Sequence, residues 1–174
     1  MKRFLVSSLA VIAVTGGMLA IDSAAALADV KIYTAGSCRV PIIANVSVSS
    51  FGVVLNNSLT LPVSIVCPIV RDHPSLKPTS VAVSVVDNSS LLIGAGAITC
   101  RLVASNRFGT QNSLGGLVST VGTNSAGTIL NLSIPAVLFV DGSYSVGCAI
   151  PRRGVGDPSS SVATIKVTEA IASP

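Results

Sequence analysis

Cysteine is the residue type in this 174-residue chain whose number and spacing point most clearly to chemistry. Cys38, Cys67, Cys100 and Cys148 are each at least 29 positions from the next. Zinc ribbons and thioredoxin-like redox sites need two cysteines only a few positions apart, and no C-x-x-C pair exists here. An even number of cysteines in an exported chain predicts two disulfides, with four buried thiols as the alternative.

Four cysteines allow three disulfide pairings, and the sequence alone does not choose among them. We favour Cys38–Cys67 with Cys100–Cys148, because Cys38 precedes the first long β-type segment and Cys67 ends it. Cys100 and Cys148 lie in two similarly patterned segments that could be neighbouring strands. In the chain-entropy model, loops of these lengths stabilise the domain by about 3.6 and about 4.1 kcal/mol.

The side chains with catalytic potential form no recognisable constellation. His73 is the single histidine, and Pro74 beside it favours a surface turn. A serine hydrolase also needs a nucleophile, but no G-x-S-x-G elbow is present. The acids that could form a glycosidase pair lie mostly next to turn residues, where they cap the backbone: Asp29, Asp72, Asp87, Asp141, Asp157 and Glu169. We therefore predict that the chain is not an enzyme.

Sites for phosphate, metals and other ligands have little support in the sequence. Gly94-Ala95-Gly96 lacks the third glycine of a nucleotide cradle, and no acidic calcium loop is present. We predict neither a cofactor nor a metal. Arg152 and Arg153, in the loop after the Cys148 segment, are weak candidates for contact with a phosphate or an acidic glycan; such a pair is also typical of a solvated loop.

Residues 1–28 have the composition of a cleavable signal peptide. Lys2 and Arg3 precede an apolar run at 4–14, and Ala26-Leu27-Ala28 is a small-x-small cleavage site. An uncleaved anchor is the alternative, since the apolar region is almost long enough to span a bilayer. We predict cleavage after Ala28 and a secreted, periplasmic or cell-surface protein with no membrane span.

Cleavage would leave residues 29–174, which is a normal length for one domain. The full chain has a formal net charge of +4, and only 10% of its residues are charged. Its basic residues are dispersed, with one adjacent pair in the proposed mature chain, so we expect no nucleic-acid partner. A protein or a surface is the partner that this composition allows.

The elements that must position these residues are predicted to be strands. Valine, isoleucine and threonine are abundant, and these side chains fit a pleated sheet better than a helix. Pro62 and Pro68 predict that their segment is an edge strand or two pieces joined by a bulge. We predict an antiparallel β-sandwich of about eight or nine strands, with a closed barrel as the alternative. The expected strands are 30–34, 45–55, 59–70, 81–85, 98–102, 117–121, 128–134, 143–150 and 162–168.

Several short motifs resemble those of uncharacterised small secreted bacterial proteins with a four-cysteine, CPIVRD-type pattern. These motifs are G-V-V-L-N-N-S at 52–58, C-P-I-V-R-D at 67–72, T-C-R-L at 99–102 and S-V-G-C-A-I-P at 145–151. The resemblance covers most of residues 29–174. It implies a bacterial origin, export and the four-cysteine framework, and it implies no activity.

Composition ranks three classes of function. A structural or interaction protein comes first, because the chain is rich in strands and disulfides rather than reactive groups. A ligand-binding module for a glycan or an anionic partner comes second; the absence of tryptophan weakens its carbohydrate version. A hydrolase is the remote alternative. Within the first class, residues 30–34 could be a strand donated to a partner's sheet, as in pilins.

Overall fold

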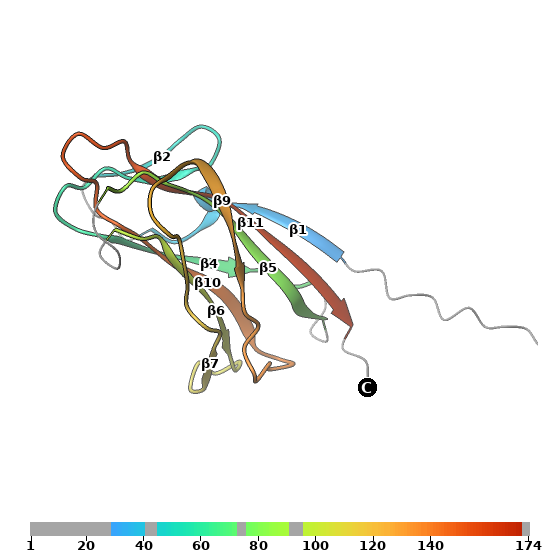
Figure 1. Ribbon diagram of the computed structural model, residues 1–174. Helices are drawn as coiled ribbons and strands as arrows, with labels where there is room; N and C mark the ends of the chain where they lie inside the picture. The colour runs from blue at the N-terminus through green and yellow to red at the C-terminus, as the bar shows by residue number, and fades with distance from the viewer. Residues whose placement is uncertain (1–28, 41–44, 73–75, 91–95, 172–174) are drawn as a thin grey trace, which may run out of the picture.

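The computed structural model describes residues 29–40, 45–72, 76–90 and 96–171. Within these ranges the chain forms eleven strands and one 3-10 turn, arranged as two antiparallel sheets (Figure 1). The predicted all-β sandwich is therefore confirmed. None of the helices in these ranges has the length and apolar character needed to cross a lipid bilayer.

The larger sheet has β11 at its centre. Its order is β2-β3-β11-β5-β9, and β1 also pairs with β11. β3 pairs with the first residues of β11, whereas β1 pairs with residues 164–169, so β1 and β3 follow one another along one side of that strand. The strands are β1 (Asp29–Thr34), β2 (Val46–Val48), β3 (Val54–Asn56), β5 (Leu76–Asp87), β9 (Asn124–Leu132) and β11 (Ser160–Ile171).

The smaller sheet has the order β4-β10-β6-β7, and β8 also pairs with β6. Its strands are β4 (Val63–Ile69), β6 (Thr99–Ser105), β7 (Asn112–Leu114), β8 (Val118–Ser119) and β10 (Ser143–Ile150). β4 ends the strand order, as Pro62 and Pro68 predicted, because proline cannot donate to a ladder. Arg39 continues the layer past β4 through an isolated antiparallel bridge to Val66.

The core lies between the two sheets and follows the two-residue period of the strands. In β4 the inward positions are buried and the outward ones exposed, from Val63 to Ile69. β5 turns Val81, Val83 and Val85 inward to meet them across the sandwich. Tyr144 is the one aromatic side chain among the buried core residues of the described ranges. Aliphatic burial therefore carries most of the packing energy.

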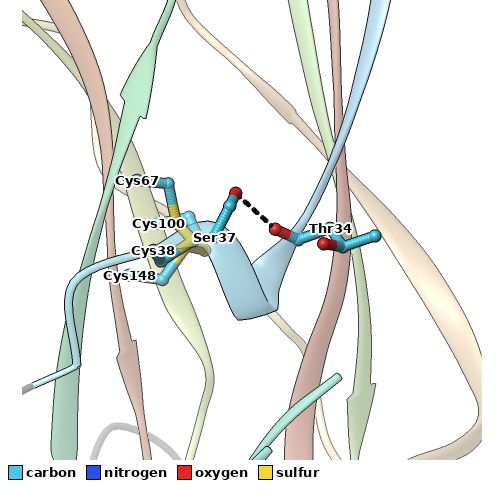
Figure 2. Close-up of a disulfide and its surroundings, with 6 residues drawn as sticks. All are labelled: Thr34, Ser37, Cys38, Cys67, Cys100 and Cys148. Atoms are coloured by element: carbon cyan, nitrogen blue, oxygen red, sulfur yellow. Dashed lines mark hydrogen bonds between the residues drawn. A yellow bond between two sulfur atoms is a disulfide. The ribbon is translucent and has the colours of Figure 1, made fainter. Parts of the chain in front are cut away.

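The structure joins Cys38 to Cys67 and Cys100 to Cys148, the pairing favoured from chain order. Cys100 and Cys148 lie directly opposite each other on β6 and β10. Cys38 follows the 3-10 turn η1 (Ala35–Ser37), in which the Ser37 hydroxyl donates to the Thr34 carbonyl at 2.8 Å (Figure 2). The first disulfide thus joins the segment after β1 to the opposite sheet.

The predicted strands 45–55 and 117–121 differ most from the structure. Residues 45–55 form a hairpin of β2 and β3 instead of one strand, because the chain turns at Gly52, whose φ is +74°. The Gly36 amide donates to the Gly52 carbonyl at 2.6 Å and fixes that turn. In the predicted strand 117–121 only β8 is formed, and β7 was not expected at all. These short strands explain why there are eleven rather than eight or nine.

Candidate binding groove

The outer face of the smaller sheet is hollowed along β4, β10 and β6. One hollow encloses about 430 Å³, and a second of about 380 Å³ continues it toward the loop after β10. The two share Thr99 and Ala149, so we call them together the outer groove. Its remaining lining residues are Thr60, Pro62, Ser64, Ile65, Val66, Ala97, Arg101, Val103, Leu117, Ser145, Gly147, Cys148, Pro151 and Arg152.

Small side chains on β10 make the floor of the outer groove low. Ser145, Gly147 and Ala149 are the outward-facing residues of β10 that line the groove. A Cβ atom placed on Gly147 would meet no atom within 4 Å. Because longer side chains on β4 and β6 stand on either side of this floor, the sheet surface becomes a trough.

Two arginines stand at opposite ends of one row across this face. Gly147 lies opposite Val66 on one side and opposite Arg101 on the other, and Val66 in turn lies opposite Arg39. Directly opposed residues of antiparallel strands share a face, so both arginines point outward. Three strand spacings place their Cα atoms roughly 14 Å apart. Neither guanidinium has a hydrogen-bond or ion-pair partner within the described residues.

Among the described residues, no carboxylate lines the outer groove. The acids of the described ranges lie at other places: Asp29, Asp72 and Glu169 beside Lys31, Asp87 and Asp157 in or next to loops, and Asp141 just before β10. The groove therefore has positive charge without local compensation. Such a surface attracts anions, most strongly at low ionic strength.

The arginine pair singled out from the sequence is divided by the fold. Arg152 lines the outer groove, and one of its guanidinium nitrogens donates to the Leu59 carbonyl at 3.1 Å. Arg153 is half-buried, and its backbone amide donates to the Ser58 carbonyl at 2.7 Å. Only the first of the two candidates therefore belongs to the groove.

Sequence reasoning missed Arg39 and Arg101 as a pair. They are far apart in the chain, and strand register alone brings them into one row. The sequence does indicate that Arg101 points outward, because it follows Cys100 in an alternating segment whose inward positions are apolar. An outward arginine in a strand otherwise lined by small residues is a reason to look for a ligand.

Three of the acids considered for catalysis surround Lys31. Its Nζ lies 3.0 Å from Glu169 Oε2, 3.0 Å from Asp72 Oδ1 and 3.7 Å from Asp29 Oδ2. Burial alone would lower the pKa of Lys31, but hydrogen bonds to Asp72 and Glu169 outweigh it and raise that pKa. The Lys31 ammonium likewise holds the pKa of Asp72 below its usual value. We name these four residues the Lys31 cluster.

The Lys31 cluster connects separate parts of the fold. Glu169 is completely buried on β11, and the Lys31 ammonium and Tyr33 hydroxyl both donate to the Val70 carbonyl after β4, at 2.9 and 2.8 Å. These contacts hold β1 against both sheets. His73, the predicted surface-turn histidine, lies outside the described residues, as do Gly94 and Ala95.

Asp87 and Asp157 are engaged by neighbouring loops. Asp87 is buried, and it accepts hydrogen bonds from the amides of Ser89 and Ile98 and from the hydroxyls of Thr120 and Ser160. Asp157 accepts from the amide and hydroxyl of Ser90, and these bonds lower its pKa. Within the ranges described, no three His, Cys, Asp or Glu residues are grouped so that they could hold a metal ion.

The chain matches no protein-family model and no curated protein sequence. Among solved structures, it is similar to a family two carbohydrate esterase from Cellvibrio japonicus, with a TM-score of 0.46 and 9% identity over 85% of this chain and 36% of that chain. It is also similar to the family 11 carbohydrate-binding module of the cellulosomal cellulase Lic26A-Cel5E of Clostridium thermocellum, with a TM-score of 0.40 and 12% identity over 84% and 91%. The chain thus spans about a third of the esterase. Both similarities are too low to transfer an activity.

Proposed function

We propose that this chain is an exported, non-catalytic binding domain whose outer groove holds an extended acidic polysaccharide. The charge of the groove carries the proposal: Arg101 and Arg152 line it, Arg39 lies on the same face at the end of the row through Gly147, and no carboxylate of the described residues lines it. Arginine binds carboxylate, sulfate and phosphate groups through charge-assisted hydrogen bonds. Arg39 and Arg101, whose guanidinium groups have no hydrogen-bond or ion-pair partner among the described residues, lie at the two ends of one row and can each hold a separate anionic group of one polysaccharide chain.

The uncharged lining also favours a polysaccharide that is acidic over one that is neutral. Ser64, Thr99 and Ser145 offer hydroxyl groups to a sugar. Within the described ranges no aromatic side chain lines the groove, so these residues offer no ring for stacking on a sugar. Recognition must then depend on charge and hydrogen bonds, and a neutral glycan would lose the charge contribution.

Export is part of the same proposal. The basic and apolar residues at 1–28 support a signal peptide cleaved after Ala28, and this cleavage leaves every described strand in the mature chain. Two disulfides fit an oxidising compartment such as the periplasm or the extracellular space. An acidic polysaccharide of a cell surface or matrix would be within reach in either place.

Binding to a panel of polymers tests this function. We expect the exported, oxidised protein to bind a polyuronate or a sulfated polysaccharide, and to bind dextran much more weakly. Arg39→Gln with Arg101→Gln should weaken binding about tenfold or more, since each removes a charge-assisted bond. Lys166→Gln, an exposed charge on the larger sheet, is the matched control and should change little. Equal affinity for dextran, or preferential binding of polyglutamate, would contradict the proposal.

Gly147→Val separates the shape of the groove from its charge. Valine is a good strand residue, and the open space at Gly147 accepts its Cβ, so the fold should be retained. The added methyl groups would raise the floor between Val66 and Arg101 and reduce affinity while all three arginines remain. Ala82→Val, on the outer face of β5, is the control. Full affinity in Gly147→Val would place the ligand elsewhere.

A further inference from the structure

The lining of the outer groove changes from row to row along β10, because strand register decides which side chains lie next to one another. In the row through Gly147, Val66 lies on one side and Arg101 on the other. Arg39 lies beyond Val66. This row, in the first hollow of about 430 Å³, therefore has an arginine at each end.

The next row along β10 is uncharged and has a hydroxyl group on each side. Ala149 lies opposite Ser64 of β4 and opposite Thr99 of β6. Because Ala149 and Thr99 line both hollows, we call this row the neck of the groove. Neither hydroxyl group has a hydrogen-bond partner within the described residues. Hydroxyl groups both donate and accept, so the neck suits the uncharged polar groups of a neutral sugar.

Positive charge returns on the far side of the neck. Arg152 is the charged residue among the described lining of the second hollow, and its guanidinium keeps further donors besides the one bound to the Leu59 carbonyl. Successive outward rows of a strand are roughly 7 Å apart, and Arg152 follows Ala149 by three residues, at most roughly 10 Å of chain. Charge, hydroxyl groups and charge thus follow one another at intervals on the scale of a sugar residue.

We propose that the preferred ligand of the outer groove is a polysaccharide in which acidic and neutral sugar residues alternate, with its chain running along β10. This inference rests on the proposed function, because it concerns the same site. One acidic sugar lies over Gly147 beside Arg101, and the next lies near Arg152. The neutral sugar between them lies over Ala149 in the neck. A polymer of uronate alone would place a carboxylate there, where no described side chain supplies a positive charge.

Calorimetric titration of the exported, oxidised protein with two oligosaccharides of equal length tests this preference. One is a hyaluronan oligosaccharide, in which glucuronate alternates with N-acetylglucosamine, and the other is an oligoglucuronate. The hyaluronan oligosaccharide has half the charges, so attraction by net charge alone predicts that it binds more weakly. The arrangement of the rows predicts the reverse order, with the hyaluronan oligosaccharide bound about threefold more tightly or better.

Ser64→Ala with Thr99→Val removes both hydroxyl groups of the neck and retains all three arginines. We expect affinity for the hyaluronan oligosaccharide to fall about fivefold, and affinity for oligoglucuronate to change by less than about twofold. Ser84→Ala with Thr164→Val is the matched control, because these residues lie directly opposite each other on β5 and β11 of the larger sheet. It should leave both affinities unchanged.

Ser64→Arg supplies the neck with a positive charge and should reverse the preference in favour of oligoglucuronate. Equal affinities in the wild type, tighter binding of oligoglucuronate, or a preference that survives Ser64→Ala with Thr99→Val would overturn the alternating pattern and leave the groove a general site for acidic chains. If neither oligosaccharide binds, the proposed function fails as well. Thermal denaturation checks that each variant folds, and the wild-type comparison needs no variant.

Discussion

Buried polar side chains join segments of this chain that are far apart in sequence. The Asn56 amide group donates to the carbonyls of Leu61 and Pro151, at 3.0 and 2.9 Å, and so fixes the loop after β10 against the one after β3. Asp87, at the end of β5, likewise joins separate segments, because it accepts hydrogen bonds from Ser89, Ile98, Thr120 and Ser160. A buried polar group is stable only when its hydrogen bonds are made, so these residues hold the loops in one arrangement.

Asp87→Asn should be strongly destabilising despite its nearly unchanged shape. The new amide group would point an N–H donor at neighbours that are themselves donors, such as the Ile98 amide or the Ser89 amide. We expect the free energy of unfolding to fall by about 3 kcal/mol, as measured by urea denaturation. Asp141→Asn changes an exposed acid and should stay within about 0.5 kcal/mol of the wild type. Equal stability of the two variants would refute this account of Asp87.

At the scale of elements, β1 depends on the Lys31 cluster as well as on its ladder with β11. Lys31 reaches Glu169 on the neighbouring strand and Asp72 beyond β4, while Cys38 joins the segment after β1 to Cys67. The cluster therefore sets the orientation of β1, with Lys31 inward and Val30 outward. The exposure of Val30 and Ile32 is a consequence of that orientation.

Lys31→Met tests this dependence. The substitution leaves the Glu169 carboxylate fully buried without its ion-pair partner, and we expect a loss of about 3 kcal/mol in urea denaturation at neutral pH. Replacing both residues, as Lys31→Met with Glu169→Leu, should recover most of that loss, because no buried charge then remains. If the double variant is no more stable than Lys31→Met, the buried Glu169 charge is not the cause of the lost stability.

Particular segments show how far the sequence specifies this fold. Alternation predicted β10 at 143–150, and the two prolines predicted that β4 would lie at an edge, because both signals are local. The hairpin of β2 and β3 was missed, since its turn at Gly52 is fixed by Gly36 from another segment. The row of Arg39 and Arg101 was missed for a related reason: strand register is decided by the whole sheet.

At the scale of the molecule, the two sheets of the sandwich present different surfaces to solvent. The smaller sheet presents the outer groove with its uncompensated arginines, while the larger sheet presents the β1 edge with its exposed aliphatic residues. The two disulfides and the aliphatic core hold these surfaces in a fixed relation. The proposed polysaccharide site therefore lies on the smaller sheet alone.

The most direct test of the central claim is to map where an acidic oligosaccharide binds, using backbone amide shifts in NMR spectra. Titration with an oligouronate should shift the amides of Val66, Arg101 and Gly147 in the outer groove, leave those of Ala82 and Lys166 on the larger sheet unchanged, and weaken as salt is added. Shifts confined to the larger sheet, or none at saturating ligand, would contradict the assignment of the groove as the binding site.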